Sequence, residues 1–232
     1  MPSEINYRAI RGYIQKGGFE GPSQNVGHIP TDDEGNVIGN SGVTIGVGFD
    51  LGQHNEQDLI NMEFSKGLID KLRPYLGKKG QEAKDIKKNN PLFLGQDSKD
   101  YLEVIMRPTK YYTDILASKY DKSTGVAGDF ESLDPAIQGT LFSVLYQYGM
   151  SKPEETTPKF WKHATSKNWT GLVNELETGD WGKNEEGTKE GLDYIYNRRK
   201  LEASKLKESG ALVTQSVIDQ DGPNILGVIN NG

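Results

Sequence analysis

The chain has 232 residues, 34% of them hydrophobic, with 27 lysines and arginines against 33 aspartates and glutamates. It has no cysteine, which excludes disulfides and thiolate metal sites, and no run of about 18 apolar residues, which excludes a membrane-spanning helix. The net charge of -6 disfavours nucleic acid as the main partner.

The N-terminal stretch predicts a helix. Ile5, Ile10 and Ile14 recur at helical spacing after Ser3, a typical N-cap residue, and two glycines follow, so we expect a helix over residues 3–17. Glu20 stands just past its end. The same stretch lacks the charged-then-apolar pattern of a signal peptide, so we expect no export by that route.

The region from Gly21 to Gly52 reads as turns with two short strands, at residues 36–39 and 43–50. From Glu56 onward the pattern is helical. We expect helices near 56–63, 66–76, 79–89, 98–120 with a break at Pro108, 134–149, 158–177 with an internal turn, and 188–209.

These elements predict an α+β fold in one domain over residues 1–232. A small β lobe would span about 20–54, and a larger helical lobe about 55–210 would pack with the first helix. No internal repeat or proline- and serine-rich linker divides the chain. Ligands would bind in a cleft between the lobes.

One glycine-rich stretch, "GNSGVTIGVGFDLGQHN", combines backbone freedom with polar side chains. In residues 43–50 the alternation puts Thr44 and Asp50 on one face, but a straight strand would separate them by roughly 20 Å. Gly46 and Gly48 can adopt positive φ angles and fold the segment into a hairpin, which would bring the two side chains together. The alternative is an ordinary hairpin with a surface threonine and a helix-capping aspartate.

Glu20 and Asp50 suit the hydrolysis of a sugar acetal. That reaction uses one protonated carboxyl to donate to the leaving oxygen and one anionic group to activate water or attack the anomeric carbon. A solvated surface position remains the simpler interpretation of Glu20 taken alone.

The order helix, acid, glycine-rich hairpin and helical lobe resembles the phage-type lysozymes. "SGVTIGVGFDLGQHN" is similar to a segment of the pesticin-like muramidase domain, a bacteriocin toxin domain on the phage lysozyme fold. The resemblance implies a lysozyme-like fold with Glu20, Thr44 and Asp50 as catalytic residues. Asp32 and Asp33 are a lesser alternative to Asp50, because phage lysozymes place an aspartate before the threonine.

Weaker resemblances continue along the chain. "AIQGTLFSVLYQYG" resembles a buried lysozyme-family helix, although Gln147 and Tyr148 stand where the family usually has Asn-x-Gly. "KFWKHATSKNWTGLVNELETGDW" resembles the following helix pair, and "GLDYIYNRRKLEASKL" resembles the C-terminal helix. In residues 56–130 we identify no such resemblance.

The resemblance assigns roles to the site residues. Glu20 would be the general acid, and Asp50 with the Thr44 hydroxyl would hold the attacking water. This geometry inverts the anomeric carbon if the carboxylates are roughly 6.5 to 9.5 Å apart, and a closer pair implies retention. Gly46, Gly48, Gln53 and Arg198 would support the site.

An arginine of the last helix has two interpretations. Arg198 or Arg199 would reach Glu20 and orient it, or the two would form a pair on the helix surface. The tryptophans and tyrosines could stack on sugar, but their spacing favours core packing. They are Trp161, Trp169, Trp181, Tyr146 and Tyr148.

The histidines His28, His54 and His163 fit no metal-ligand spacing, so we expect no metal and no cofactor. The resemblance implies a muramidase that cleaves the β-1,4 bond between N-acetylmuramic acid and N-acetylglucosamine. The alternatives are a catalytically inactive glycan-binding module and a glycosidase for chitin or chitosan.

The expected partners are the glycan strands of peptidoglycan and a periplasmic immunity protein. We expect a monomer that neither binds nucleic acid nor inserts into membranes. The protein would act in the periplasm or cell wall of a target bacterium, as a toxin or effector or as a phage endolysin.

Overall fold

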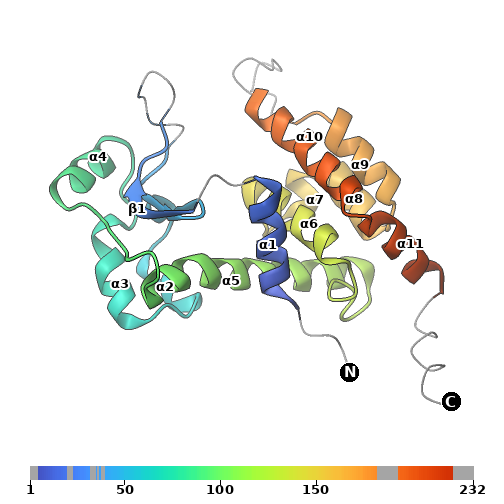
Figure 1. The fold of residues 1–232 in the computed structure, drawn as a ribbon, viewed down its shortest axis with the longest axis horizontal. Helices are drawn as coiled ribbons and strands as arrows, with labels where there is room; N and C mark the ends of the chain where they lie inside the picture. Colours follow the sequence, from blue (N-terminus) through green and yellow to red (C-terminus); the bar gives the residue numbers. More distant parts are fainter. Residues whose placement is uncertain are drawn as a thin grey trace, which may run out of the picture. The chain divides into compact units, whose positions relative to one another are not determined.

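The computed structural model describes residues 5–19, 23–31, 35, 37, 40–181 and 193–221. These form many helices and one three-stranded antiparallel sheet, which confirms the α+β class (Figure 1). In chain order the elements are α1 Tyr7–Gly17, β1 Gln24–His28, β2 Thr44–Gly46, β3 Phe49–Asp50, η1 Leu51–Gln53, α2 Glu56–Asn61, α3 Lys66–Leu72, η2 Arg73–Tyr75, α4 Gly80–Asn89, α5 Lys99–Thr124, α6 Pro135–Tyr148, α7 Pro153–Thr156, α8 Pro158–Thr165, α9 Trp169–Thr178, α10 Asp193–Glu208 and α11 Ala211–Asp221.

The chain divides into two compact units. The helical unit comprises Met1–Phe19 with Tyr112–Gly232, and the sheet unit comprises Glu20–Tyr111. Residues 56–111 thus cluster with the strands, whereas the sequence pattern assigned them to the helical lobe. α5 runs from the sheet unit into the helical unit. That the whole chain works as one catalytic domain stays a prediction.

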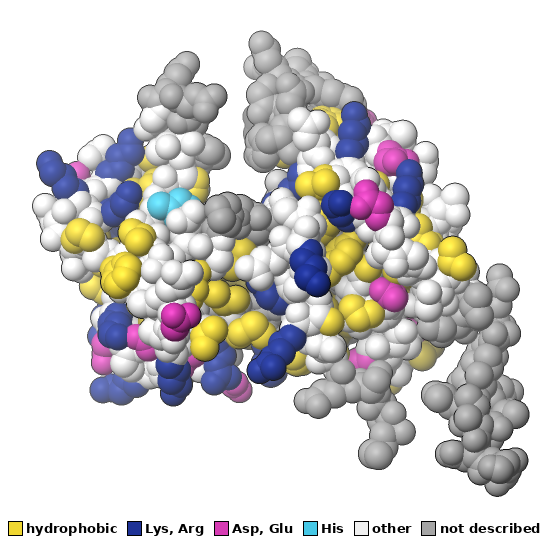
Figure 2. Space-filling view, in the orientation of Figure 1, with side chains coloured by type: hydrophobic (Ala, Val, Ile, Leu, Met, Phe, Trp, Pro, Cys, Tyr) yellow, Lys and Arg dark blue, Asp and Glu magenta, His cyan; other side chains and the backbone are white. Residues whose placement is uncertain are grey.

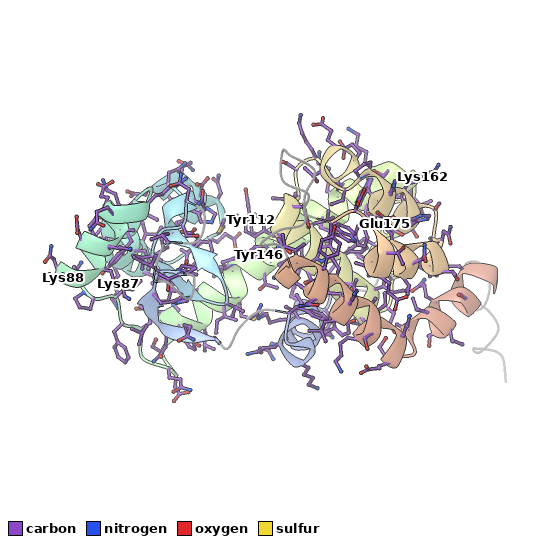
Figure 3. The ribbon with its side chains drawn as sticks, turned by 90° about the horizontal axis from the view of Figure 1, so that it is seen from above. Lys87, Lys88, Tyr112, Tyr146, Lys162 and Glu175 are labelled. Carbon is purple, nitrogen blue, oxygen red and sulfur yellow. The ribbon has the colours of Figure 1, made fainter. Side chains whose placement is uncertain are left out.

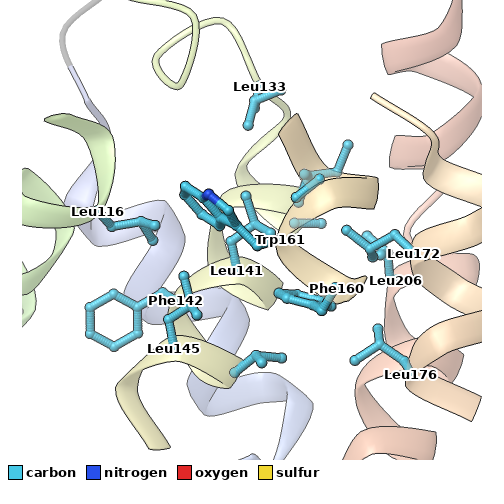
Figure 4. Close-up of a cluster of buried hydrophobic side chains, with 14 of the residues drawn as sticks. Leu116, Leu133, Leu141, Phe142, Leu145, Phe160, Trp161, Leu172, Leu176 and Leu206 are labelled. Atoms are coloured by element: carbon cyan, nitrogen blue, oxygen red, sulfur yellow. The ribbon is translucent and has the colours of Figure 1, made fainter. Parts of the chain in front are cut away.

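The core of the helical unit is built around α6. The residues of this helix from Ala136 to Leu145 are all buried, including the polar Gln138, Thr140 and Ser143, as expected for a helix surrounded by others. Figure 4 shows part of the cluster, with Trp161 among side chains of α6, α8 and α9. Trp161, Trp169 and Trp181 are all buried, which confirms their packing role.

The first helix begins later than predicted. The Asn6 side chain accepts a hydrogen bond from the backbone N–H of Ala9 at 2.9 Å and caps the helix, so α1 starts at Tyr7. Ser3, the predicted cap, lies outside the described residues. Gly18 ends the helix with φ 70°, as the two glycines predicted.

The predicted break at Pro108 is wrong, because α5 is continuous through it. Pro108 has no N–H to donate to the carbonyl of Val104, so α5 lacks one backbone hydrogen bond there. The helix tolerates this loss because buried side chains on both sides of the proline hold it in place. Val104 is buried before the proline, and Leu116 and Tyr120 are buried after it.

Four elements of the described part of the chain were not predicted: β1, α11 and the short helices η1 and α7. β1 has a polar sequence, QNVGH, that carries no strand signal of its own, and α11 follows the last predicted helix. Of the predicted strand at 36–39, only Val37 is described, in an isolated bridge with Thr31. Residues 188–192 of the last predicted helix also lie outside the described part.

The sheet has the order β1-β2-β3. Gln24 pairs with Gly46 and His28 with Thr44, so β1 bulges against the shorter β2. Under the sheet the ring of Phe49 stacks on that of Phe64, with centroids 5.7 Å apart, and Leu59 is buried nearby on α2. This packing fixes one face of the hairpin β2–β3.

Candidate active site

The hairpin brings Thr44 and Asp50 side by side. They are direct partners across β2 and β3. The N–H of Leu51 donates to the carbonyl of Val43 at 2.9 Å, so Thr44 and Asp50 form a pair without mutual hydrogen bonds. In such a pair the Cα atoms are about 4.5 Å apart and the side chains share one face. The hairpin prediction is confirmed.

Two glycines make this turn. Gly46 has φ 66° and Gly48 has φ 74°, values at which a β-branched residue is strained. Gly46 also lies against α5, because a Cβ at this position would come within 2.7 Å of Val104 Cγ1. The predicted conformation of both glycines is therefore confirmed.

The Asp50 carboxylate is held by two backbone donors. Its Oδ1 accepts from the N–H of Gly42 at 3.0 Å and from the N–H of Gly52 at 2.8 Å. The second contact also makes Asp50 the N-cap of η1. The alternative interpretation of Asp50 as a helix cap is therefore correct for Oδ1, but it does not involve Oδ2. Among the residues that the structure describes, Oδ2 has only the distant amide of Gln53, at 3.4 Å, and it is the oxygen left for a ligand.

Sequence reasoning did not identify Gly42 and Gly52 as part of the site. The two backbones touch, because a Cβ on Gly42 would stand 2.6 Å from Gly52 Cα and 2.4 Å from the carbonyl oxygen of Lys78. Only glycine allows this approach, which places both N–H groups at Asp50. The sequence did offer a signal for this close approach, because Gly42 and Gly52 flank the predicted hairpin on its two sides.

Hydrogen bonds connect Asp50 through Gln53 to Lys79. Gln53 Nε2 donates to the carbonyl of Asn40 at 2.9 Å, and Lys79 Nζ donates to Gln53 Oε1 at 2.8 Å. Thr44 is 4% exposed, and its hydroxyl lies 3.4 Å from the carbonyl of Gly42. Gln53 is therefore oriented from both ends of its amide and presents Nε2 toward the free side of Asp50.

His54 lies beside these hydrogen-bonded residues. Its ring stacks on Phe49, with centroids 4.6 Å apart. Burial lowers the pKa of His54 below its ordinary value of 6.5, although Asp58 and Asp50 act in the opposite direction. The imidazole is therefore uncharged at neutral pH and packs against the hairpin. This agrees with its interpretation as an ordinary polar residue.

Glu20 lies outside the described residues, as do Asp32 and Asp33. The role of Glu20, the choice between Asp50 and the two other aspartates, and the separation of the two carboxylates stay predictions. Inversion or retention at the anomeric carbon depends on that separation.

The arginines of α10 are not a surface pair. Arg199 is fully buried, and its Nη2 donates to Glu202 Oε1 at 2.8 Å and to Gln147 Oε1 at 2.9 Å. Arg198 is 18% exposed and donates to Ser143 Oγ at 3.0 Å and to Glu202 at 3.3 Å. Gln147, which departs from the family pattern, thus binds a buried guanidinium. Burial raises the pKa of Glu202, and the two arginines oppose this shift.

The aromatic candidates are packing residues. In Figure 3 Tyr112 and Tyr146 lie near one another, and their ring centroids are 5.4 Å apart in an edge-on arrangement. Tyr148 packs on Trp181 at 5.4 Å. Trp181 also borders a cavity of about 220 Å³ in the helical unit, together with Tyr148 and Phe160.

Within the described ranges, no three histidine, aspartate or glutamate side chains converge as a metal site. No helix in the same part of the chain combines the length and the apolar character that a bilayer crossing requires.

No curated protein matches the chain. A family model described as "Pesticin: Bacterial toxin homologue of phage lysozyme, C-term" matches residues 11–170, a range that includes Glu20, the hairpin and α6 but ends before Arg198. Because this match spans well over half of the 232 residues, the chain belongs to the Pesticin family of bacterial toxin homologues of phage lysozyme.

Proposed function

We propose that the protein is a muramidase that cleaves the β-1,4 bond between N-acetylmuramic acid and N-acetylglucosamine in peptidoglycan. Membership of a family of phage lysozyme homologues supports a lysozyme-like peptidoglycan hydrolase in general. The observation that carries the finer proposal is the hairpin, which sets the Asp50 carboxylate beside Thr44 with Oδ2 left for a ligand.

In this mechanism Glu20 donates its proton to the glycosidic oxygen as the bond from that oxygen to the anomeric carbon breaks. Asp50 Oδ2 accepts a proton from a water molecule that the Thr44 hydroxyl helps to orient, and the water oxygen attacks the anomeric carbon from the opposite face. The product sugar has inverted configuration. The backbone donors at Oδ1 fix the direction of Oδ2, which reduces the cost of positioning the water.

The supporting residues act on orientation. Gly46 and Gly48 keep the hairpin turned, and Gln53 holds the free side of Asp50 through Nε2. Arg198, which Ser143 and Glu202 fix in place, is proposed to reach Glu20 and orient the acid. The single domain over residues 1–232 carries all of these groups.

The decisive experiment is Glu20→Gln, measured by the release of reducing ends from purified peptidoglycan. We expect loss of activity with an almost unchanged melting temperature, because the substitution removes a proton donor and little packing. Glu155→Gln, an exposed acid paired with Lys152, is the matched control and should remain active. Residual activity of Glu20→Gln above a few per cent would remove Glu20 as the acid.

The same assay separates the alternatives. A wild-type protein that binds peptidoglycan without releasing reducing ends would be an inactive glycan-binding module, and release from chitin or chitosan instead would assign another polymer.

The family supports a toxin that acts on the cell wall rather than an endolysin. We propose that it works as a monomer in the periplasm of a target bacterium and that the producer holds an immunity protein. Lysis of cells that express the protein with an exported leader, and their rescue by a neighbouring small reading frame, would test this setting.

A further inference from the structure

Two exposed apolar side chains meet on the outer edge of the sheet. Val26 of β1 and Phe93 are antiparallel partners in an isolated bridge. The N–H of Gly27 donates to Leu92 at 2.8 Å, and the N–H of Leu94 donates to Asn25 at 2.9 Å. This pattern identifies a pair without mutual hydrogen bonds, whose side chains lie close together on one face. Phe93 is 65% exposed and Val26 is 46% exposed.

The backbone holds this pair in place. Leu92 and Leu94 on either side of Phe93 are buried, so the alternation along the segment points Phe93 away from the core. Gly27 permits the close approach, since a Cβ there would stand 2.9 Å from Leu92 Cβ. The Tyr75 hydroxyl donates to the carbonyl of Asn90 at 2.8 Å and anchors the preceding turn. An exposed aromatic ring on a fixed backbone loses little freedom when it binds a ligand.

Two lysines lie in the last turn of α4, the helix that precedes Phe93 in the chain. Lys87 and Lys88 lie together near the end of α4 (Figure 3), and neither makes an ion pair or side-chain hydrogen bond with any residue that the structure describes. The acids of α4 are engaged elsewhere: Glu82 pairs with Lys78, and Asp85 accepts from Gln81. Figure 2 shows hydrophobic and basic side chains next to each other over this part of the sheet unit.

Lys87 lies near β1. Burial lowers the pKa of His28, and the charge of Lys87 lowers it further. Val26 is exposed, Gly27 is buried and His28 is half-buried, and this local alternation places Val26 and His28 toward the same side of β1. Together Val26, His28, Lys87, Lys88 and Phe93 form what we call the basic aromatic patch.

We propose that the basic aromatic patch binds the carboxylate-bearing glycan of the cell wall at a position outside the active site. This inference rests on the proposed function, since the same polymer is the substrate. The C–H face of a sugar ring packs on an exposed aromatic ring, and the carboxylates of wall peptides attract lysines. The chain carries a net charge of -6, so the patch is a local exception that suits an anionic polymer. A bilayer fits less well, because stable anchoring needs more than one aromatic residue and two lysines.

Sedimentation with purified insoluble peptidoglycan sacculi tests the patch. All variants carry Glu20→Gln so that binding is measured without turnover. We expect Phe93→Ala and the double variant Lys87→Gln/Lys88→Gln each to weaken binding about five-fold or more. The effect of the lysine variant should disappear in about 0.5 M salt, whereas that of Phe93→Ala should persist.

Matched controls come from elsewhere in the chain. Ile60→Ala removes another half-exposed apolar side chain of the sheet unit, and Lys159→Gln/Lys162→Gln removes two exposed lysines of the helical unit. Both should bind sacculi like the parent. Equal binding by parent and patch variants at melting temperatures that show an intact fold would overturn the proposal.

Binding to vesicles that contain an anionic phospholipid is measured for the same variants, to test whether the patch binds a membrane surface instead. Loss of vesicle binding in the patch variants without loss of sacculus binding would also overturn the proposal and assign the patch to a membrane surface. The release of reducing ends by the wild-type protein is scored separately. If no ends are released but the patch variants still lose sacculus binding, the patch stands and the muramidase proposal falls.

Discussion

In the helical unit, side chains supply the packing: α6 is buried from Ala136 to Leu145, and three buried tryptophans come from other elements. In the sheet unit, the hairpin with Asp50 turns at Gly46 and Gly48, which have no side chains. Apolar packing fixes the first region, whereas the turn of the hairpin also depends on the backbone conformation of two glycines. Substitutions of packing residues in the helical unit should therefore change only the free energy of unfolding, whereas substitutions in the hairpin should change turnover as well.

The largest effect is expected at Asp50. Asp50→Asn keeps the shape of the side chain but removes the base that accepts the proton from water, so we expect turnover to fall by about 10³-fold. Thr44→Ala should cost less, and Thr44→Ser, which keeps the hydroxyl, should recover part of the loss. Steady-state release of reducing ends measures all three. Full activity of Asp50→Asn with an inactive Asp32→Asn or Asp33→Asn would move the base to one of those residues.

Packing residues of the helical unit should affect stability alone. Trp161 is buried and packs edge-on against Tyr120, with ring centroids 5.9 Å apart. Trp161→Ala should lower the free energy of unfolding by about 3 to 5 kcal/mol, and Trp161→Phe should lower it less. Denaturant melts give these values. Turnover per folded molecule should stay near that of the wild type, and a specific loss of turnover would contradict the division between the two regions.

Substitution of the hairpin glycines should reduce both the stability of the fold and the turnover per folded molecule. Gly48→Val places a β-branched residue at φ 74°, and Gly46→Val adds a clash with Val104. We expect a stability loss on the order of 1 to 3 kcal/mol for Gly48→Val. The lost alignment of Asp50 and Thr44 should also reduce turnover per folded molecule, at least as far as Thr44→Ala does.

Circular dichroism counts the folded fraction for this test. Gly67→Val supplies a control, because this glycine of α3 has open space around its Cβ position. Unchanged turnover of folded Gly48→Val would mean that the hairpin is only a scaffold.

The smallest effect concerns pH. Burial lowers the pKa of His28 and His54 below the ordinary 6.5, so the unfolded chain binds more protons than the folded chain just below that pH. The stability from these neutral rings is fully present above pH 6.5 and is lost as the pH falls below it. Both residues lie in the sheet unit, so hydrogen exchange should show earlier opening there than in α6.

Denaturant melts between pH 7.5 and pH 5.5 measure the total effect. His54→Gln should flatten the dependence. His163→Gln removes a histidine of the helical unit and is the matched control. Stability that is constant over this range would contradict the expected uptake of protons on unfolding.

Local patterns predicted most helices, because helical periodicity and cap residues act within a few positions of the chain. The pattern also predicted the hairpin, since Gly46 and Gly48 stand where only positive φ angles turn the strand. Where the sequence failed, a distant contact decided. Pro108 remains inside α5 because buried side chains hold both halves, and β1 forms because Gly27 and Asn25 pair with a segment near residue 93.

The site shows the same division. The sequence by itself determined that Thr44 and Asp50 meet across a glycine turn, because backbone sterics are local. Only the tertiary structure decided which oxygen of Asp50 is left for a ligand, because Gly42 and Gly52 reach the carboxylate through a close backbone approach. It also decided that Arg199 is buried against Glu202 and Gln147 rather than exposed, because burial of a charge depends on partners that the fold brings from another helix.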